Sequence, residues 1–242
     1  MKNPTDLGFN RTGISTSPLL TKEMLSDMIP PSSQGDSGSL LSYREIFLRE
    51  AEPIGTVPIP TEIKGMASAA IHALKGERMQ VLIDKLSERA SFERTGVRLY
   101  DLLINKCTER NAAADGISLD QIRAIRDDEL HHFRLVAQTM RKLGADPTAM
   151  SPSADVHAVM SMGPLKVIAD PRTSVQHSFQ AILVAELTDN AEWPLLIKLA
   201  DSMGMKEEVT AFEAAQATEL RHLADIRAIV HRLTLNDAQL LH

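Results

Sequence analysis

The chain has 242 residues and a formal net charge of −6, and its 43% hydrophobic and 24% charged residues are typical of a globular protein rather than a disordered one. The acidic balance argues against a nucleic-acid partner. No segment approaches the roughly 18 consecutive apolar residues that cross a bilayer, so no membrane partner is expected.

A single cysteine, Cys107, excludes an intrachain disulfide, a CxxC redox pair and a four-cysteine metal site. The first ten residues lack the apolar core of a signal peptide, and we expect a cytoplasmic protein. Aromatic residues amount to only 4%, which favours helices because strands draw on aromatic and β-branched residues. The sequence therefore predicts an all-α protein.

Residues 1–63 are predicted to form a mostly irregular N-terminal arm with a short helix, followed by one helical domain at 64–242. Seven of the twelve prolines lie in the first sixty residues, and none lies between 61 and 146. A short amphipathic helix is predicted at 42–51 and another at 64–74. The proline-containing segment between them is predicted to be extended, because proline excludes helix there.

Four long helices are predicted next, at 79–109, 118–143, 174–203 and 206–233, from apolar residues that recur with helical spacing. Short loops join the first to the second and the third to the fourth, so each pair is predicted to be an antiparallel hairpin. Residues 144–173 form a long connection with one short helix at 154–162. The pattern predicts a four-helix bundle of two hairpins with a long crossover between the second and third helices.

Each hairpin carries one Glu-x-x-His motif on an apolar helix face. Glu129 and His132 lie one turn apart on the second helix, and Glu219 and His222 have the same spacing on the fourth. A single motif of this kind is weak support for a site. Two of them, on corresponding helices, suggest a metal-binding function.

The first helix of each hairpin carries a further glutamate on its apolar stripe. Glu93 precedes the next motif by 36 residues, and Glu186 precedes its counterpart by 33. An aromatic residue follows each glutamate after seven residues, Tyr100 in one hairpin and Trp193 in the other. This spacing indicates a pseudo-repeat of two helical hairpins.

Four carboxylates buried in an apolar core would be strongly unfavourable without a cation, because each loses its hydration and repels the others. Two divalent cations would balance these four negative charges. Ligands of oxygen and nitrogen without sulfur suit iron or manganese better than a tetrahedral zinc site.

At this point the sequence resembles the ferritin-like di-iron carboxylate superfamily, in which two helices each supply one glutamate and two supply Glu-x-x-His. The resemblance covers residues 80–233 and implies two iron ions, or a mixed manganese/iron pair. The ligands that it implies are Glu93, Glu129, His132, Glu186, Glu219 and His222. The spacing from Glu93 to Tyr100 resembles the rubrerythrin branch, although one cysteine cannot form a rubredoxin iron site. The chain is most similar to bacterial ferritin-like domain proteins, for which the resemblance implies a metal site but no particular reaction.

Several neighbours of these residues have two interpretations. Asp128 is either a hydrogen-bond acceptor that orients His132 or a surface acid. Asp189 is either such an acceptor or a seventh ligand, and the first is favoured. Tyr100 is a further residue that could support a ligand, although, like Trp193, it is more often a core residue than a radical carrier.

Other residues near the motifs are expected to lie outside the site. Glu88 and His131 are predicted to lie on solvated faces because their neighbours are charged or polar. Pro194 is predicted to kink the third helix, to accompany a π-bulge or to break the helix.

The expected function is redox chemistry on dioxygen or peroxide at a di-iron site, with an unidentified reductant or small-molecule substrate. Two other functions remain open at this stage. One is an iron-handling ferroxidase or storage subunit, and the other is a structural metal-stabilised bundle that acts in protein interaction. The long arm is compatible with a homo-oligomer.

Overall fold

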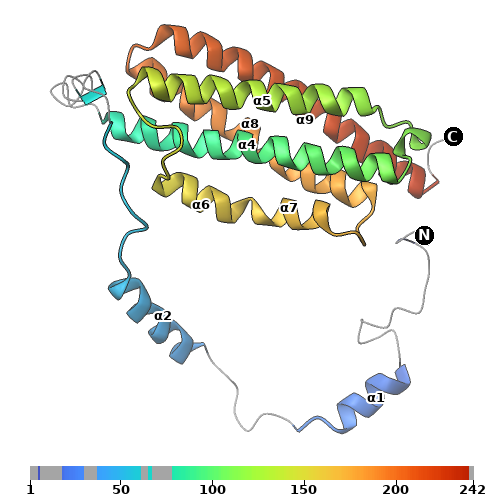
Figure 1. The fold of residues 1–242 in the computed structure, drawn as a ribbon. Coiled ribbons are helices and arrows are strands. Elements are labelled where there is room, and N and C mark those ends of the chain that lie inside the picture. The colour runs from blue at the N-terminus through green and yellow to red at the C-terminus, as the bar shows by residue number, and fades with distance from the viewer. Residues whose placement is uncertain (1–4, 6–17, 30–36, 61–64, 67–77, 240–242) are drawn as a thin grey trace. The chain divides into compact units, whose positions relative to one another are not determined.

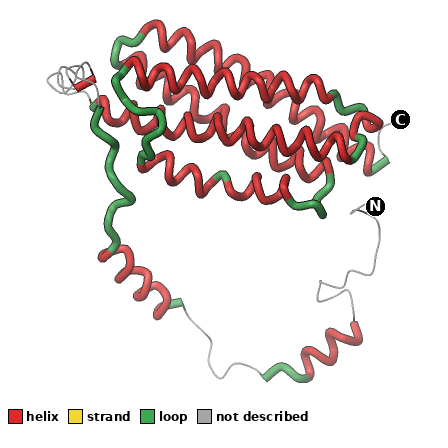
Figure 2. Tube along the Cα trace, viewed as in Figure 1, coloured by secondary structure: helices red, strands yellow, loops and turns green. Residues whose placement is uncertain are grey.

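The computed structural model describes residues 5, 18–29, 37–60, 65–66 and 78–239. Every regular element in these residues is a helix, and they contain no strand (Figures 1 and 2). The all-α prediction is confirmed for this part of the chain. The chain divides into two compact units, Met1–Pro53 and Ile54–His242. The predicted boundary between residues 63 and 64 lies outside the described residues, as does nearly all of the predicted helix at 64–74.

The first unit contains α1 (Pro18–Ser26) and α2 (Gly38–Glu50). Helix α2 corresponds to the helix predicted at 42–51 and begins four residues earlier. Helix α1 lies in a segment that was predicted to be irregular, and that prediction was wrong. Proline at the first position of α1 is compatible with helix because the N–H that it lacks has no intrahelical acceptor there.

The second unit contains four long helices, α4 (Met79–Glu109), α5 (Leu119–Lys142), α8 (Val175–Ser202) and α9 (Lys206–Asp237). Their bounds agree with the predicted ones to within one residue, except that α9 continues four residues further. Pro194 lies inside α8 without ending it, so the break that was one of the predicted outcomes does not occur.

Local hydrogen bonds set the ends of these helices. The Ser118 hydroxyl accepts a hydrogen bond from the Gln121 backbone N–H at 3.2 Å at the start of α5. At the start of α8, Ser174 accepts from the His177 backbone N–H at 3.1 Å, and the His177 ring accepts from the Ser174 N–H at 3.3 Å. The turn between α8 and α9 uses Gly204 at φ +71°, a left-handed conformation that favours glycine.

The long helices pack as two hairpins, α4 with α5 and α8 with α9, with further contacts between α4 and α8 and between α5 and α9. Figure 1 shows α4 and α9 running in one direction along this helical bundle and α5 and α8 in the other. The crossover contains two helices, α6 (Pro152–Met160) and α7 (Met162–Ala169), which pack along α4. The single helix predicted at 154–162 therefore understated the helical content of this segment.

Two apolar clusters fill the bundle, and each of the four long helices contributes to both. In every one of these helices, the buried acidic residues lie between the part that enters one cluster and the part that enters the other. The first cluster includes Leu103, Cys107, Ile122, Phe179, Ile182 and Ile226. The second includes Leu82, Leu86, Val136, Met140, Trp193 and Phe212. The polar centre is thus enclosed by apolar side chains along the bundle.

No helix in the described part of the chain combines the length and the apolar character that a bilayer-spanning segment needs.

Candidate metal centre

The structure brings all six predicted ligands together between the four long helices. Each of them is at most 3% exposed. Helix α4 supplies Glu93, α5 supplies Glu129 and His132, and the remaining three come from α8 and α9. Residues that are far apart in the sequence therefore meet because the apolar stripe of each helix faces the same interior.

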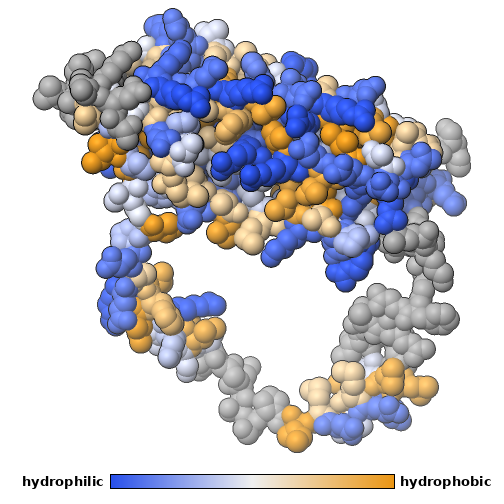
Figure 3. Space-filling model, viewed as in Figure 1, coloured by the Kyte–Doolittle hydropathy of each residue, from blue (hydrophilic) through white to orange (hydrophobic). Residues whose placement is uncertain are grey.

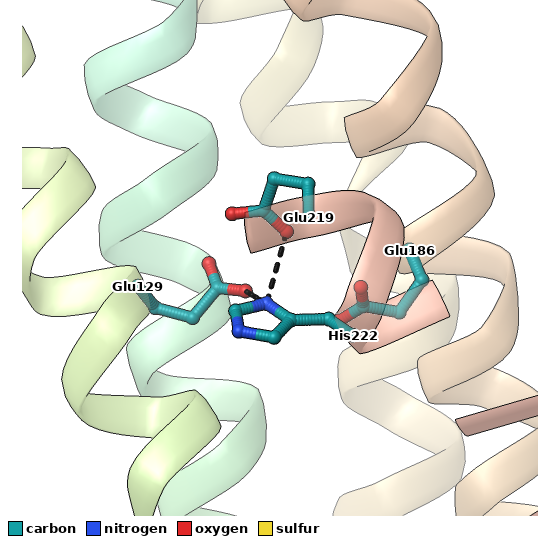
Figure 4. A group of neighbouring side chains, drawn as sticks. All are labelled: Glu129, Glu186, Glu219 and His222. Carbon is teal, nitrogen blue, oxygen red and sulfur yellow. Dashed lines mark hydrogen bonds and ion pairs between the residues drawn. The ribbon is translucent and has the colours of Figure 1, made fainter. Parts of the chain in front are cut away.

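One group of potential ligand atoms comes from Glu129, Glu186, Glu219 and His222, and these atoms all lie within 4.8 Å of one another. Figure 4 shows the three carboxylates and the imidazole pointing toward a common region. The His222 Nδ1 atom lies 3.1 Å from Glu219 Oε2 and 4.0 Å from Glu129 Oε1. This group has the size and the donor types of a cation site.

A second group contains Glu93, His132 and Glu219, again with its ligand atoms within 4.8 Å of one another. The His132 Nδ1 atom lies 2.5 Å from Glu219 Oε1 and 3.9 Å from Glu93 Oε2. Glu219 belongs to both groups, with one oxygen near each histidine. The two groups therefore form adjacent positions that share a carboxylate.

Several potential ligand atoms in this cluster are buried and lack a hydrogen-bond partner among the described residues. They are Glu93 Oε2, Glu129 Oε2, Glu186 Oε2 and Asp189 Oδ2. Buried polar atoms without a partner are rare and costly in folded proteins. Bound cations would provide the missing interactions, so the residues present fit a metal centre.

The pKa values of the cluster reflect this crowding. Burial raises the pKa of Glu129 well above its usual value, and the charge of Glu219 adds to the effect. Burial also raises the pKa of Glu186 to about 8. For Glu219 burial acts in the same direction, but hydrogen bonds from His132 and His222 outweigh it and lower its pKa to about 2. Most of these carboxyl groups thus resist ionisation unless a positive charge is close.

Arg89 is a buried member of the cluster that the sequence analysis did not identify. It is 2% exposed, and its Nε donates to Glu93 Oε1 at 2.7 Å. Its Nη2 pairs with Asp189, and its Nη1 lies 3.2 Å from Glu192 Oε2. The guanidinium carbon also lies 4.5 Å from the centre of the Trp193 ring. The sequence does contain a hint, because Arg89 lies one turn before Glu93 on the apolar stripe of α4.

Arg89 alters the charge balance of the centre. The cluster contains five buried carboxylates, those of Glu93, Glu129, Glu186, Asp189 and Glu219. The sequence argument counted four of them and no buried cation. With Asp189 and Arg89 both included, four negative charges remain, and two divalent ions would still balance them. Asp189 and Arg89 thus leave the number of ions that neutrality requires unchanged.

The other neighbours of the motifs have distinct positions. The Tyr100 hydroxyl donates to Glu186 Oε1 at 2.5 Å, so this residue supports a predicted ligand. Asp128 was predicted either to orient His132 or to be a surface acid; its side chain is 48% exposed and lies 3.1 Å from His222 Nε2, on a different helix. Asp189 pairs with Arg89, and it also belongs to a further group of potential ligands with Glu93, Glu129 and Glu219.

The two residues expected outside the site differ in exposure. His131 is exposed, as predicted. Glu88 is mostly buried and forms an ion pair with Lys85 at 2.5 Å, so the expectation of a solvated face was wrong for it. Its side chain is 17% exposed.

Gly96 was also missed, although a glycine inside a long helix is itself a hint because glycine disfavours helix. A Cβ atom at this position would overlap with the carboxylate of Glu129. Glycine therefore lets α4 approach the Glu129 side chain closely, which places that carboxylate in the cluster.

The fold and the centre together define a class: an all-helical bundle with a buried carboxylate–histidine cluster whose donor atoms could hold metal ions. Models of known protein families, curated proteins and solved structures were compared with the chain, and none of them matches it. A functional assignment therefore depends on the chemistry of these residues.

Proposed function

We propose that this chain is a di-metal carboxylate protein with a ferritin-like bundle, and that it performs redox chemistry on dioxygen or peroxide. The observation that carries the proposal is the sharing of Glu219 between two adjacent groups of ligand atoms drawn from four helices. In ferritin-like proteins, one glutamate from each of two helices and a Glu-x-x-His motif from each of the other two would hold a pair of metal ions.

The two positions share Glu219 and otherwise use different residues. Glu129, Glu186, Glu219 and His222 would hold one ion, and Glu93, His132 and Glu219 would hold the other. Donors of oxygen and nitrogen without sulfur favour two iron ions or a mixed manganese/iron pair. When bound, such ions supply electrons to dioxygen or peroxide, and an unidentified reductant or organic substrate completes the reaction.

The order and direction of the helices support a ferritin-like arrangement. Two hairpins are joined by a long crossover, and that connection returns along the bundle so that α5 and α8 run in the same direction (Figure 1). Bundles with one long crossover are the ferritin-like variant of the four-helix topology.

Residues around the ligands have supporting roles in this proposal. Arg89 holds one oxygen of Glu93 and leaves the other unpartnered. Tyr100 holds its proton against Glu186, and Asp128 lies against His222 Nε2, so that Nδ1 of the ring faces the carboxylates. Partners of this kind orient ligands and adjust their basicity.

Metal analysis tests the proposal directly. We expect about two ions per chain after anaerobic loading with ferrous iron, as the shared-carboxylate arrangement implies. The optical spectrum should then change on exposure to dioxygen. One zinc ion per chain with no iron uptake would contradict the proposal. Accumulation of iron far beyond the site would indicate storage, and a redox-silent metal would indicate a structural role.

Substitutions identify the ligands. His132→Ala and Glu219→Ala should each reduce iron uptake to about one ion per chain or fewer, because each removes a donor from a buried position. His131→Ala and Glu213→Ala are matched controls, since both residues are exposed on the same helices. Equal iron uptake by all four variants would refute the site.

A further inference from the structure

A cavity of about 310 Å³ lies at the side of the bundle, between α4, α8 and the two crossover helices. It is separate from the space between the ligands. Its apolar lining includes Phe92, Leu99, Met160, Pro164, Val184 and Ala185. A cavity of this size is at the lower end of the range of small-molecule sites, which suits a compact organic molecule.

The lining carries no charged side chain, and its hydroxyl groups are already engaged within the wall. Thr95 donates to the Ser91 carbonyl at 2.8 Å, and Thr188 donates to the Val184 carbonyl at 3.1 Å. The Ser161 hydroxyl lies 2.6 Å from His157 Nε2 and donates to the His157 carbonyl at 2.8 Å. An ionised occupant would lose its hydration without gaining a partner here.

His157 adds one polar group to this lining. Its side chain is buried, and burial lowers its pKa to about 4, so the ring is neutral near pH 7. Of the polar lining atoms, only its Nδ1 is buried without a hydrogen-bond partner among the described residues. The cavity is therefore suited to an uncharged molecule with few polar groups.

Gly96 connects the cavity to the metal centre. It lines the cavity, and a Cβ atom on it would overlap with the Glu129 carboxylate. The same two long helices place Phe92 and Ala185 in the cavity wall and the adjoining Glu93 and Glu186 in the ligand cluster. Adjacent positions on α4 and on α8 thus face the cavity and the ligand cluster.

The cavity opens through apolar residues. Met160 is 61% exposed and Val184 is 55% exposed, although both belong to the lining. Other apolar side chains are exposed along the crossover helices (Figure 3). Scattered exposed apolar residues are common, but a group around a cavity marks a binding surface.

We propose that this cavity binds an uncharged, mostly apolar organic molecule and holds it beside the metal centre as the substrate. The part of the proposal that concerns the metal rests on the proposed function. Three observations support an uncharged and mostly apolar occupant: the lining is neutral, its hydroxyl groups are engaged within the wall, and the entrance is apolar.

Calorimetric titration of the full chain with octanol, and with octanoate as its charged counterpart, tests the binding site. Octanol should bind, and octanoate should bind at least about tenfold more weakly because its carboxylate loses hydration in the neutral cavity. Val184→Trp should abolish octanol binding by filling the cavity from α8. Leu187→Trp is the matched control, since Leu187 is 47% exposed on the same helix and does not line the cavity.

Met160→Trp fills the cavity from the opposite wall and serves as a second test if Val184→Trp does not fold. Failure of octanol to bind, or equal binding by the filling variants and the control, overturns the cavity proposal. Stronger binding of octanoate than octanol overturns the assignment of an uncharged occupant.

A separate measurement tests whether the bound molecule lies beside the metal centre. In protein loaded with Co²⁺, octanol should shift the visible absorption bands of the ion, and Val184→Trp should remove that shift. Octanol binding without a shift contradicts the proposed position. If the protein binds neither Co²⁺ nor Fe²⁺, the proposed function is overturned. The octanol titration of the same protein then still decides whether the cavity is a binding site.

Discussion

At the residue scale, Arg89 shows how one buried cation affects a cluster of carboxylates. It contacts Glu93, Asp189 and Glu192, and its guanidinium also lies over the Trp193 ring. The charges of these carboxylates raise the pKa of Arg89 although burial opposes the shift, so this residue stays charged. Removal of its charge would leave buried carboxylates without a counter-ion.

Arg89→Met is expected to destabilise the metal-free protein by about 3–5 kcal/mol, the usual cost of breaking a buried ion pair by removing one partner. Denaturant unfolding measures the change. Adding Asp189→Leu to this variant should recover part of the loss because it removes one of the unpaired charges. Arg123→Met is the control, since Arg123 is exposed and its ion pair with Asp120 contributes little. A loss for Arg89→Met no larger than that of the control would contradict this role.

Gly96 gives a second prediction at this scale. Gly96→Ala should weaken metal binding and lower the melting temperature, because its Cβ atom would displace the Glu129 carboxylate. On helix propensity alone, the same substitution would stabilise the helix by about 1 kcal/mol. Gly163→Ala is the matched control, since a Cβ atom there meets nothing within 4 Å. Stabilisation by Gly96→Ala with unchanged metal binding would show that the close contact is unimportant.

At the scale of the elements, hydrogen bonds at the helix ends position the ligands along the bundle. Helix α8 begins at a reciprocal pair between Ser174 and His177, and Lys106 on α4 donates to the Asp170 carbonyl at 2.9 Å just before it. These contacts hold the end of the crossover and the start of the helix that carries Glu186.

Ser174→Ala should lower the free energy of unfolding by about 1 kcal/mol, because the His177 backbone N–H loses its acceptor. Ser174→Asp should retain most of the stability, since aspartate is also a good residue at this position. Ser202→Ala, near the other end of the helix, is the control because that serine is exposed. Equal unfolding curves for Ser174→Ala and wild type would show that the cap is dispensable.

At the scale of the whole molecule, the buried carboxylates should make stability without metal depend on pH. Burial raises the pKa of Glu186 from 4.5 to about 8, so its stabilising contribution is complete below about pH 4.5 and is lost as pH rises to about 8. Burial opposes the shift of His222, but Glu219 raises its pKa from 6.5 to about 9, and its contribution is also lost with rising pH. The lowered pKa of Glu219 acts oppositely, with a loss only as pH falls from 4.5 to about 2.

We therefore expect the metal-free protein to melt at a higher temperature near pH 5 than near pH 8, because the contributions of Glu186 and His222 are lost as the pH rises. Loading with metal should reduce this difference, because cations replace protons as the partners of the carboxylates. Thermal melts with and without a chelator at both pH values measure the effect. A metal-free protein that becomes more stable toward pH 8 would contradict the burial of these groups.

The spacing of apolar residues and the residues at helix ends were sufficient to predict the four long helices and their pairing into hairpins. Apolar stripes, Ser118, Ser174 and Gly204 act within one or two turns of the chain, so their effect is local. The same stripes carry the glutamates and histidines, and this is why the six predicted ligands converge in the structure. Helices α1 and α7 were not predicted, because short helices have few turns in which a pattern can appear.

The tertiary structure alone decided which charged neighbours enter the centre. Arg89 and Asp189 are separated by 100 residues, and their pairing depends on the packing of α4 against α8. Asp128 reaches His222 across the bundle, a contact that spacing along α5 does not indicate. The cavity beside Gly96 likewise exists only where the crossover covers two helices. Helical periodicity determines which face of each helix is buried, whereas the contacts between those faces depend on the packing of the assembled bundle.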